Sequence, residues 1–241
     1  MSSAASRVAI IFGAGSNVGA ALVKGFVGAG YRVATVSRSR PTTTTTTGGA
    51  SSNPFNIQAD LSDPAAPPAV LEQLAQAGWA FPSVVVWNAA ALTPPDASDP
   101  ANPFAIAEAD FDRDMAVMSR SPYRAAGEAV KVWREREGDA ATGRRGTFIM
   151  TGNMTPSRIF SPALTTLGAG KSAANYWVGT ADAAFKEQGI RFFFADERSP
   201  GGGPVSKTNG ESHAKMYLDL VEGKEDLPYY VTFMDGKPHK F

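Results

Sequence analysis

Short runs of consecutive apolar residues recur along the chain and mark the strands that we expect. Six such runs occupy residues 7–12, 31–36, 83–87, 146–150, 190–195 and 229–234. Because the apolar residues follow one another without alternating with polar ones, these strands are expected to be buried on both faces, as in a parallel sheet.

Longer segments with helical character separate the apolar runs. They occupy residues 17–29, 66–77, 104–137, 163–188 and 211–222. This alternation predicts right-handed βαβ units, and hence an α/β fold with a doubly wound parallel sheet and helices on both faces. Since the sequence contains no internal repeat, we expect one domain over residues 1–241.

One segment departs from the alternation. Residues 40–54, RPTTTTTTGGASSNP, are poor in apolar side chains and end in proline, so they bury little surface. They stand where a helix would normally connect the second strand to the third. The composition predicts a flexible Thr/Gly/Ser-rich surface loop.

Charge and composition narrow the range of partners. Lysine plus arginine (23) balance aspartate plus glutamate (23), so no global field favours nucleic acid or an anionic membrane. The chain has no cysteine and no apolar run long enough to cross a membrane. The two histidines show no metal-ligand spacing, and we expect no metal site. These features predict a cytoplasmic protein that binds a small-molecule substrate, and neither nucleic acid nor a membrane.

The turn after the first strand has the composition of a phosphate-binding site. The sequence FGAGSNVG places Gly13, Gly15 and Gly19 between an apolar strand and a helix. Glycine lets the backbone approach a diphosphate closely, and the helix N-terminus offers unpaired N–H groups and a partial positive charge. Because this pattern follows a strand and opens a helix, it predicts a dinucleotide site. The residues expected to contact the dinucleotide here are Gly13, Gly15, Ser16, Asn17, Val18 and Gly19.

The end of the second strand bears on the choice of dinucleotide. An acidic residue there favours NAD, because its carboxylate accepts the ribose hydroxyls. This chain has Ser37 and Arg38 instead. An arginine pairs with the 2′-phosphate of NADP, so NADP(H) is the expected cofactor and NAD(H) the less favoured one. A solvated basic loop is the alternative reading of the same residues.

Several motifs in order resemble those of the short-chain dehydrogenase/reductase family over essentially the whole chain. They are GAGSNVG (13–19), ADLSD (59–63), WNAA (87–90), GTFIMTGN (146–153), Lys171 and SPGGGPV (199–205). The resemblance implies a Rossmann fold with further cofactor contacts from Asp60, Leu61, Asn88, Lys171, Pro200 and Gly201. Phe12 and Asn17 replace a threonine and a glycine of the family's glycine motif.

The resemblance also implies a catalytic set, and this chain departs from it. Lys171 matches the family's lysine, which binds the nicotinamide ribose and lowers the pKa of a tyrosine four residues earlier; that position holds Leu167. The family's serine aligns with Asn153, with Thr151 and Thr155 as neighbours, and its asparagine aligns with Met118. The expected catalytic residues are therefore Lys171, Asn153 and Thr155, in an atypical set without the tyrosine.

The missing phenol leaves the reaction open. One hypothesis is an NADP(H)-dependent reductase in a biosynthetic pathway that acts on an activated carbonyl, or on an iminium ion, which accepts hydride without needing a proton. The other is a non-redox protein on the same fold, either a cyclase similar to a Diels–Alderase or a binder that senses the cofactor. The resemblance further implies a homodimer or homotetramer, and residues 196–212 are expected to form a lid over substrate and cofactor.

Overall fold

The computed structural model describes residues 7–39 and 54–241, which form an eight-stranded sheet in the order β3-β2-β1-β4-β5-β6-β7-β8. The expected fold class is confirmed, because every pairing is parallel except that of β7 with β8. The strands are β1 (Val8–Phe12), β2 (Arg32–Ser37), β3 (Phe55–Gln58), β4 (Val84–Trp87), β5 (Gly146–Thr151), β6 (Ile190–Glu197), β7 (Tyr230–Met234) and β8 (Lys237–Pro238).

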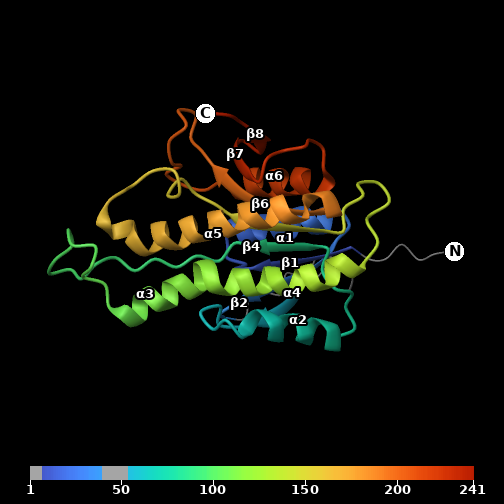
Figure 1. Cartoon of the computed structure of the whole chain (residues 1–241), viewed down its shortest axis with the longest axis horizontal. Coiled ribbons are helices and arrows are strands. Elements are labelled where there is room, and N and C mark those ends of the chain that lie inside the picture. Colours follow the sequence, from blue (N-terminus) through green and yellow to red (C-terminus); the bar gives the residue numbers. More distant parts are fainter. Residues whose placement is uncertain (1–6, 40–53) are drawn as a thin grey trace.

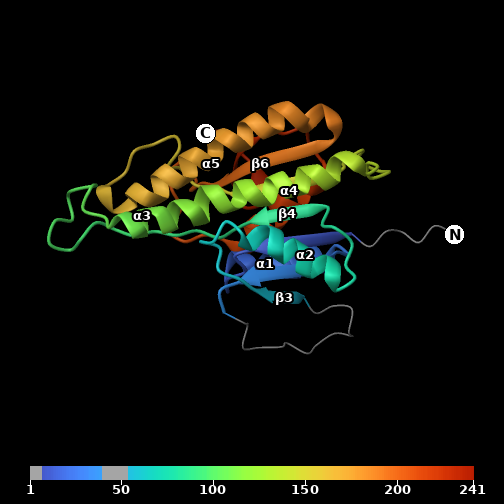
Figure 2. The same cartoon turned by 60° about the horizontal axis from the view of Figure 1, so that its bottom comes forward.

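Helices cover both faces of the sheet (Figure 1). They are α1 (Val18–Gly28), α2 (Ala66–Gln76), α3 (Glu108–Met115), α4 (Ser121–Glu135), α5 (Thr165–Phe185) and α6 (Gly210–Glu222). A π-helical segment, Ala116–Arg120, joins α3 to α4, so the three make one long helical rod that runs beside α5 (Figure 2).

The core consists of two apolar layers separated by the sheet. One layer lies between the sheet and α2, α4 and α5, and the other between the sheet and α1 and α6. Both layers are dense. A Cβ added to Gly146 would lie 2.1 Å from the ring of Trp133, so α4 packs directly on the start of β5. This packing follows from the unbroken apolar runs, since each central strand sends side chains into both layers.

Two short strands escaped the sequence analysis. β3 has only four residues, with Phe55 and Ile57 facing the protein and Asn56 and Gln58 exposed. This alternation is typical of an edge strand with one covered face, whereas the prediction used continuous apolar runs. β8 has two residues and pairs antiparallel to β7. The expected helix over 104–137 begins instead at Glu108, because residues 88–107 form a long loop after β4.

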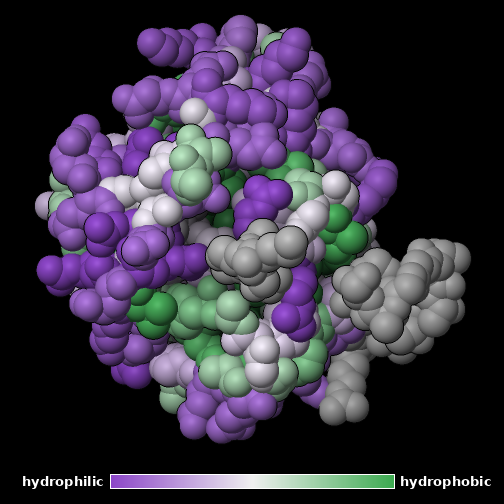
Figure 3. Space-filling view, turned by 90° about the vertical axis from the view of Figure 1, so that its right-hand side faces the viewer, coloured by the Kyte–Doolittle hydropathy of each residue, from purple (hydrophilic) through white to green (hydrophobic). Residues whose placement is uncertain are grey.

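The parallel strands place their carboxyl ends at one edge of the sheet. The loops after β4 and β5, and the starts of α3 and α5, extend past the sheet at this edge, on the left of Figure 1. Figure 3 shows the opposite face, at the amino ends of the strands, where hydrophilic residues surround a more apolar centre. Ligands of open α/β sheets bind at the carboxyl edge, which is therefore the place expected for a functional site.

The expected flexible loop, residues 40–54, lies outside the described residues except for Pro54. No helix within residues 7–39 and 54–241 has both the length and the apolar composition needed to cross a membrane.

Candidate functional site

The turn between β1 and α1 uses its three glycines in different ways. Gly13 has φ +90°, and a Cβ there would lie 2.4 Å from the backbone N of Ala89. A Cβ on Gly19 would lie 2.6 Å from the Cα of Ala14. Gly15 differs, because nothing lies within 4 Å of its added Cβ. Gly13 and Gly19 therefore allow close packing within the protein, whereas Gly15 faces open space.

The first turn of α1 presents unpaired donors to the same open space. The backbone N–H groups of residues 16–19 donate to no acceptor among the residues that the structure describes. This first turn also has no acidic side chain. Unpaired amides at a helix N-terminus attract an anion, so the turn fits the diphosphate of a dinucleotide cofactor. The side chain of Val18 is buried in the core, which leaves its amide for such a contact.

The end of β2 lies against this turn. The N–H groups of Gly13 and Ala14 both donate to the Val36 carbonyl, at 2.9 and 3.2 Å. Ser37 and Arg38 follow directly, and the Arg38 side chain is exposed. The basic residue predicted to favour NADP(H) is therefore brought close to the glycine turn.

Asp60 and Leu61 follow β3 at the same edge. The N–H and hydroxyl of Ser62 donate to one Asp60 oxygen at 2.9 and 2.8 Å, and these bonds hold the pKa of Asp60 below its ordinary value. The Leu61 side chain is buried in the core and anchors the loop that follows β3.

Thr151, the last residue of β5, connects the two faces of the sheet. The Tyr217 hydroxyl donates to Thr151 Oγ1 at 2.8 Å, and Oγ1 donates to Asn88 Oδ1 at 3.0 Å. Asn88 Nδ2 then donates to the Gly13 carbonyl at 2.8 Å. Both polar atoms of the Asn88 side chain are thus engaged, and Asn88 supports the glycine turn from within the protein. Burial raises the pKa of Tyr217 well above its ordinary value, so its phenol stays neutral and donates.

Lys171 is buried beside this chain of hydrogen bonds. Its side chain lies on α5, is 3% exposed, and donates from Nζ to the Thr151 carbonyl at 2.7 Å. An ammonium has three N–H donors, and no second acceptor binds Nζ among the described residues. Leu167, one helical turn earlier, is only half-buried. A buried lysine with unused donors therefore stands one helical turn from a side chain that is partly exposed to solvent.

Burial of Lys171 makes stability depend on pH. Burial lowers its pKa from 10.5 to about 8, so below pH 8 the folded protein carries the full penalty of a buried charge. Between pH 8 and 10.5 the unfolded chain keeps the proton that the folded protein loses, and stability rises with pH. We expect urea unfolding to show a rise of up to about 3 kcal/mol over this range, relative to Lys171→Met. Parallel pH profiles for the two proteins would contradict this.

Asn153 and Thr155 form a turn directly after β5. The N–H and hydroxyl of Thr155 donate to Asn153 Oδ1 at 3.1 and 2.6 Å. The Thr155 Cβ lies 3.8 Å from the position of a Cβ added to Gly168, the residue after Leu167. Because Oδ1 already accepts two bonds, Asn153 Nδ2 is the side-chain atom that remains as a donor to a substrate oxygen.

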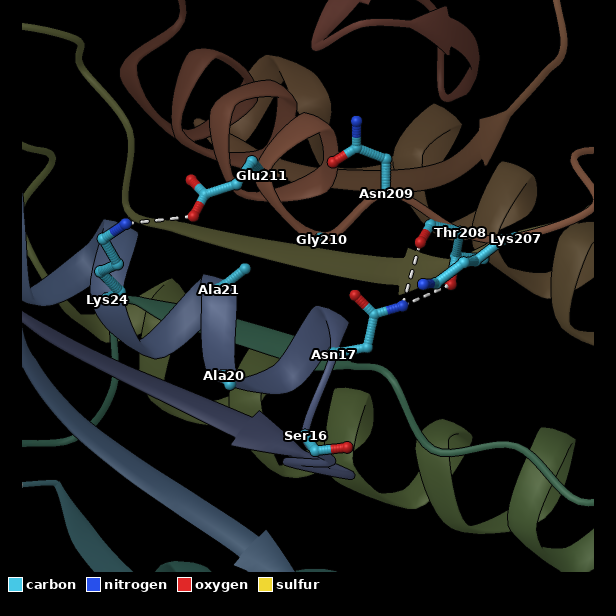
Figure 4. A pocket seen from close by; sticks show the side chains of 10 residues that line it. All are labelled: Ser16, Asn17, Ala20, Ala21, Lys24, Lys207, Thr208, Asn209, Gly210 and Glu211. Atoms are coloured by element: carbon cyan, nitrogen blue, oxygen red, sulfur yellow. Dashed lines mark hydrogen bonds and ion pairs between the residues drawn. The ribbon is translucent and has the colours of Figure 1, made fainter. Parts of the chain in front are cut away.

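The segment predicted as a lid connects β6 to α6. Pro200 and Gly201 are exposed at the tip of a tight turn, in which the Gly202 N–H donates to the Ser199 carbonyl at 2.8 Å. This turn packs on the C-terminal Phe241, and the contact of these two residues with a nicotinamide stays a prediction. The later part of the segment reaches α1, because Asn17 Nδ2 donates to Thr208 O and Oγ1 at 2.9 and 3.0 Å (Figure 4).

Several features of the site had no signal in the sequence. Tyr217 belongs to an amphipathic helix, in which a buried aromatic residue is ordinarily core. The contact between Asn17 and Thr208 joins residues that are 191 positions apart. Met118 lies in the π-helical segment, and a Cβ on Gly170 would lie 2.7 Å from its Cβ, so α5 packs tightly here.

Comparisons with known proteins agree with this architecture. The profile of the family described as short chain dehydrogenase matches residues 7–195. The short chain dehydrogenase/reductase dmxR12 of Cryptosporiopsis sp. (strain 8999) is 34% identical over 245 residues, covering 96% of this chain and 93% of that protein.

Solved structures share the fold at low identity. A metagenomic short-chain oxidoreductase in complex with NADP has a TM-score of 0.70 at 18% identity, covering 96% of this chain and 99% of its own. An oxidoreductase of the same family from Brucella ovis, in complex with a partially ordered NAD, has a TM-score of 0.68 at 18% identity. The match covers 95% of this chain and 99% of that protein's chain. With the profile match spanning β1 to β6 and a curated relative aligned almost end to end, the chain belongs to the short chain dehydrogenase family.

Proposed function

We propose that this protein is an NADP(H)-dependent oxidoreductase of the short-chain type with a degenerate catalytic set, acting on an iminium ion or an activated carbonyl in a biosynthetic pathway. One observation supports this above the others: Lys171 is buried with unused donors near an open glycine turn, while Leu167 stands in place of the phenol. The family, and the relatives whose names or complexes include reductase, NADP or NAD, support the redox class.

NADPH, when bound, supplies a hydride. The glycine turn and the amides of residues 16–19 would hold its diphosphate, and Lys171 Nζ would donate to the nicotinamide ribose. Asn153 Nδ2 would donate to a carbonyl oxygen and position the substrate beside Thr155. Asn88 would act indirectly, because it fixes the Gly13 carbonyl.

The two substrate classes differ in their need for a proton. An iminium ion that accepts hydride becomes a neutral amine, and no acid is required. A carbonyl becomes an alkoxide that must be protonated, and the Lys171 ammonium, with a pKa of about 8, is the donor we propose for it. Turnover of cyclic iminium ions is therefore expected to exceed that of simple ketones.

The test is a titration followed by a substrate panel. Fluorescence titration should give saturable binding of NADPH, and NADPH consumption should then be followed with ketones, aldehydes and cyclic imines. Binding without consumption of NADPH by any of these would favour the rival proposal, a non-redox cyclase or cofactor-sensing protein, which the absence of a phenol at Leu167 also supports. Binding of neither NADPH nor NADH would refute both redox and sensing roles.

Arg38 provides a prediction about cofactor choice. Its side chain is exposed and lies two residues after Val36, whose carbonyl binds the glycine turn; there it would pair with the 2′-phosphate that NADPH has and NADH lacks. We expect Arg38→Gln to raise the Kd of NADPH about tenfold and to leave that of NADH within about twofold. Arg38→Lys, which keeps the charge, should retain most of the preference. Equal weakening of both cofactors by Arg38→Gln would show that Arg38 does not read the 2′-phosphate.

We also propose a cytoplasmic homodimer or homotetramer formed through α4 and α5. The outer surface of these helices exposes Tyr123 (61%) and Tyr176 (76%), large side chains that an interface would cover. Sedimentation velocity of the wild type measures the assembly directly.

A further inference from the structure

A groove lies between the start of α1 and the start of α6, next to the glycine turn. It has a volume of about 550 Å³. Its lining, shown in Figure 4, combines the first two turns of α1 and the start of α6 with the end of the lid segment. The lining residues that matter here are Asn17, Lys24, Lys207, Thr208 and Glu211.

The two lysines of the groove differ in their surroundings. Lys24 Nζ lies 3.1 Å from Glu211 Oε1, so its charge is balanced within the groove. Lys207 forms no ion pair with any described residue, and residues 1–6 and 40–53 contain no aspartate or glutamate. Figure 4 shows the Lys207 side chain extending toward Asn17, at the start of α1, while Lys24 points to Glu211.

Lys207 is exposed to solvent and stands beside a second positive group of the protein, the start of α1. The N-terminus of α1 carries a partial positive charge, and its first turn has neither an acidic residue nor acceptors for the amides of residues 16–19. An unpaired ammonium beside it adds a second positive group. An anion bound between the helix end and the ammonium would reverse the sign of this interaction.

A specific contact fixes the backbone next to Lys207. Asn17 Nδ2 donates to both the carbonyl and the hydroxyl of Thr208, the neighbour of Lys207. A glycine at position 17 would have no side chain to make these bonds. Asn17, one of the two residues that depart from the family's glycine motif, thus joins the lid segment to the start of α1.

We propose that Lys207 binds the diphosphate of the dinucleotide cofactor, and that the Asn17–Thr208 contact positions it there. This inference rests on the proposed function, since it adds a ligand to the same cofactor site. Lys207 and the amides of α1 would approach the diphosphate from opposite sides, so the lid segment would take part in binding the nucleotide as well as covering the substrate.

The test compares three variants by fluorescence titration with NADPH and with NADH. Lys207→Gln should raise the Kd of both nucleotides by the same factor, about tenfold, or about 1.4 kcal/mol, because both carry the diphosphate. Lys207→Arg should restore most of the affinity. Lys24→Gln is the matched control, with an effect below about twofold, since an exposed lysine already paired to Glu211 contributes little.

The contribution of Lys207 to nucleotide binding should depend on the salt concentration. In about 1 M salt the Debye length falls to about 3 Å, and the difference between Lys207→Gln and the wild type should shrink. An unchanged Kd, an effect equal to that of Lys24→Gln, or an effect confined to NADPH would each overturn the inference while leaving the proposed function intact. Failure of the wild type to bind either nucleotide would overturn both.

Discussion

Replacing Leu167 by tyrosine is expected to create or strongly increase ketone reduction. Leu167 lies one helical turn before Lys171, on the same face of α5, and its side chain is partly exposed to solvent. Lys171 Nζ has unused donors and would lower the pKa of the new phenol. A positioned general acid contributes about 10²- to 10⁴-fold in rate, and we expect an increase of this order. NADPH oxidation with a panel of simple ketones measures it.

The control for this experiment is Leu167→Phe, which adds the ring without the hydroxyl. If both variants reduce ketones faster by the same factor, the increase comes from packing of the ring and the phenol hydroxyl has no role. If ketone reduction increases in neither variant while NADPH still binds, then the surroundings of Lys171 do not support carbonyl reduction. Reduction of iminium ions should change little in either variant, because that reaction needs no acid.

Gly13→Ala should strongly destabilise the protein. The residue has φ +90°, a conformation that costs other residues about 1–2 kcal/mol, and its added Cβ would lie 2.4 Å from Ala89 N. That contact is with backbone, and Ala89 N is itself bonded to the Phe12 carbonyl at 3.0 Å, so little relaxation is available. Overpacking adds about 1–3 kcal/mol, and we expect a total loss of about 2–5 kcal/mol in urea unfolding.

Gly15→Ala is the matched comparison, because the same methyl group meets nothing within 4 Å. Its stability should stay within about 0.5 kcal/mol of the wild type, whereas its methyl would occupy the space proposed for the diphosphate and weaken NADPH binding. Equal destabilisation by the two variants would contradict the different roles assigned to these glycines.

The sequence was sufficient to predict most of the fold because buried parallel strands leave unbroken apolar runs. The six expected strands coincide with β1, β2, β4, β5, β6 and β7 to within about two residues at each end. β3 was missed because only Phe55 and Ile57 face the protein. β8 was missed because a strand of two residues is too short to show a hydrophobic pattern. The π-helical segment Ala116–Arg120 was missed because its apolar spacing is close to that of an α-helix.

The candidate site was only partly predictable. Motif order located the glycine turn, which opens α1, and Lys171, which lies within the long helix after β5. It could not reveal that Asn88 acts on Gly13, or that Tyr217 reaches Thr151, because these bonds join elements 63 to 75 positions apart. Contacts of this kind depend on the packed fold and have no local pattern in the sequence.

The direction of the hydrogen bonds at Thr151 has an electrostatic consequence. The Gly13 carbonyl can only accept, so Asn88 donates to it from Nδ2 and presents Oδ1 to Thr151. Thr151 Oγ1 then donates to Asn88 Oδ1 and accepts from the neutral Tyr217 phenol. The negative end of that carbonyl dipole is thereby occupied by a donor, close to the unpaired amides at the start of α1. A side chain of α6, in the layer behind the sheet, thus helps to orient the donor that lowers the negative potential at the glycine turn.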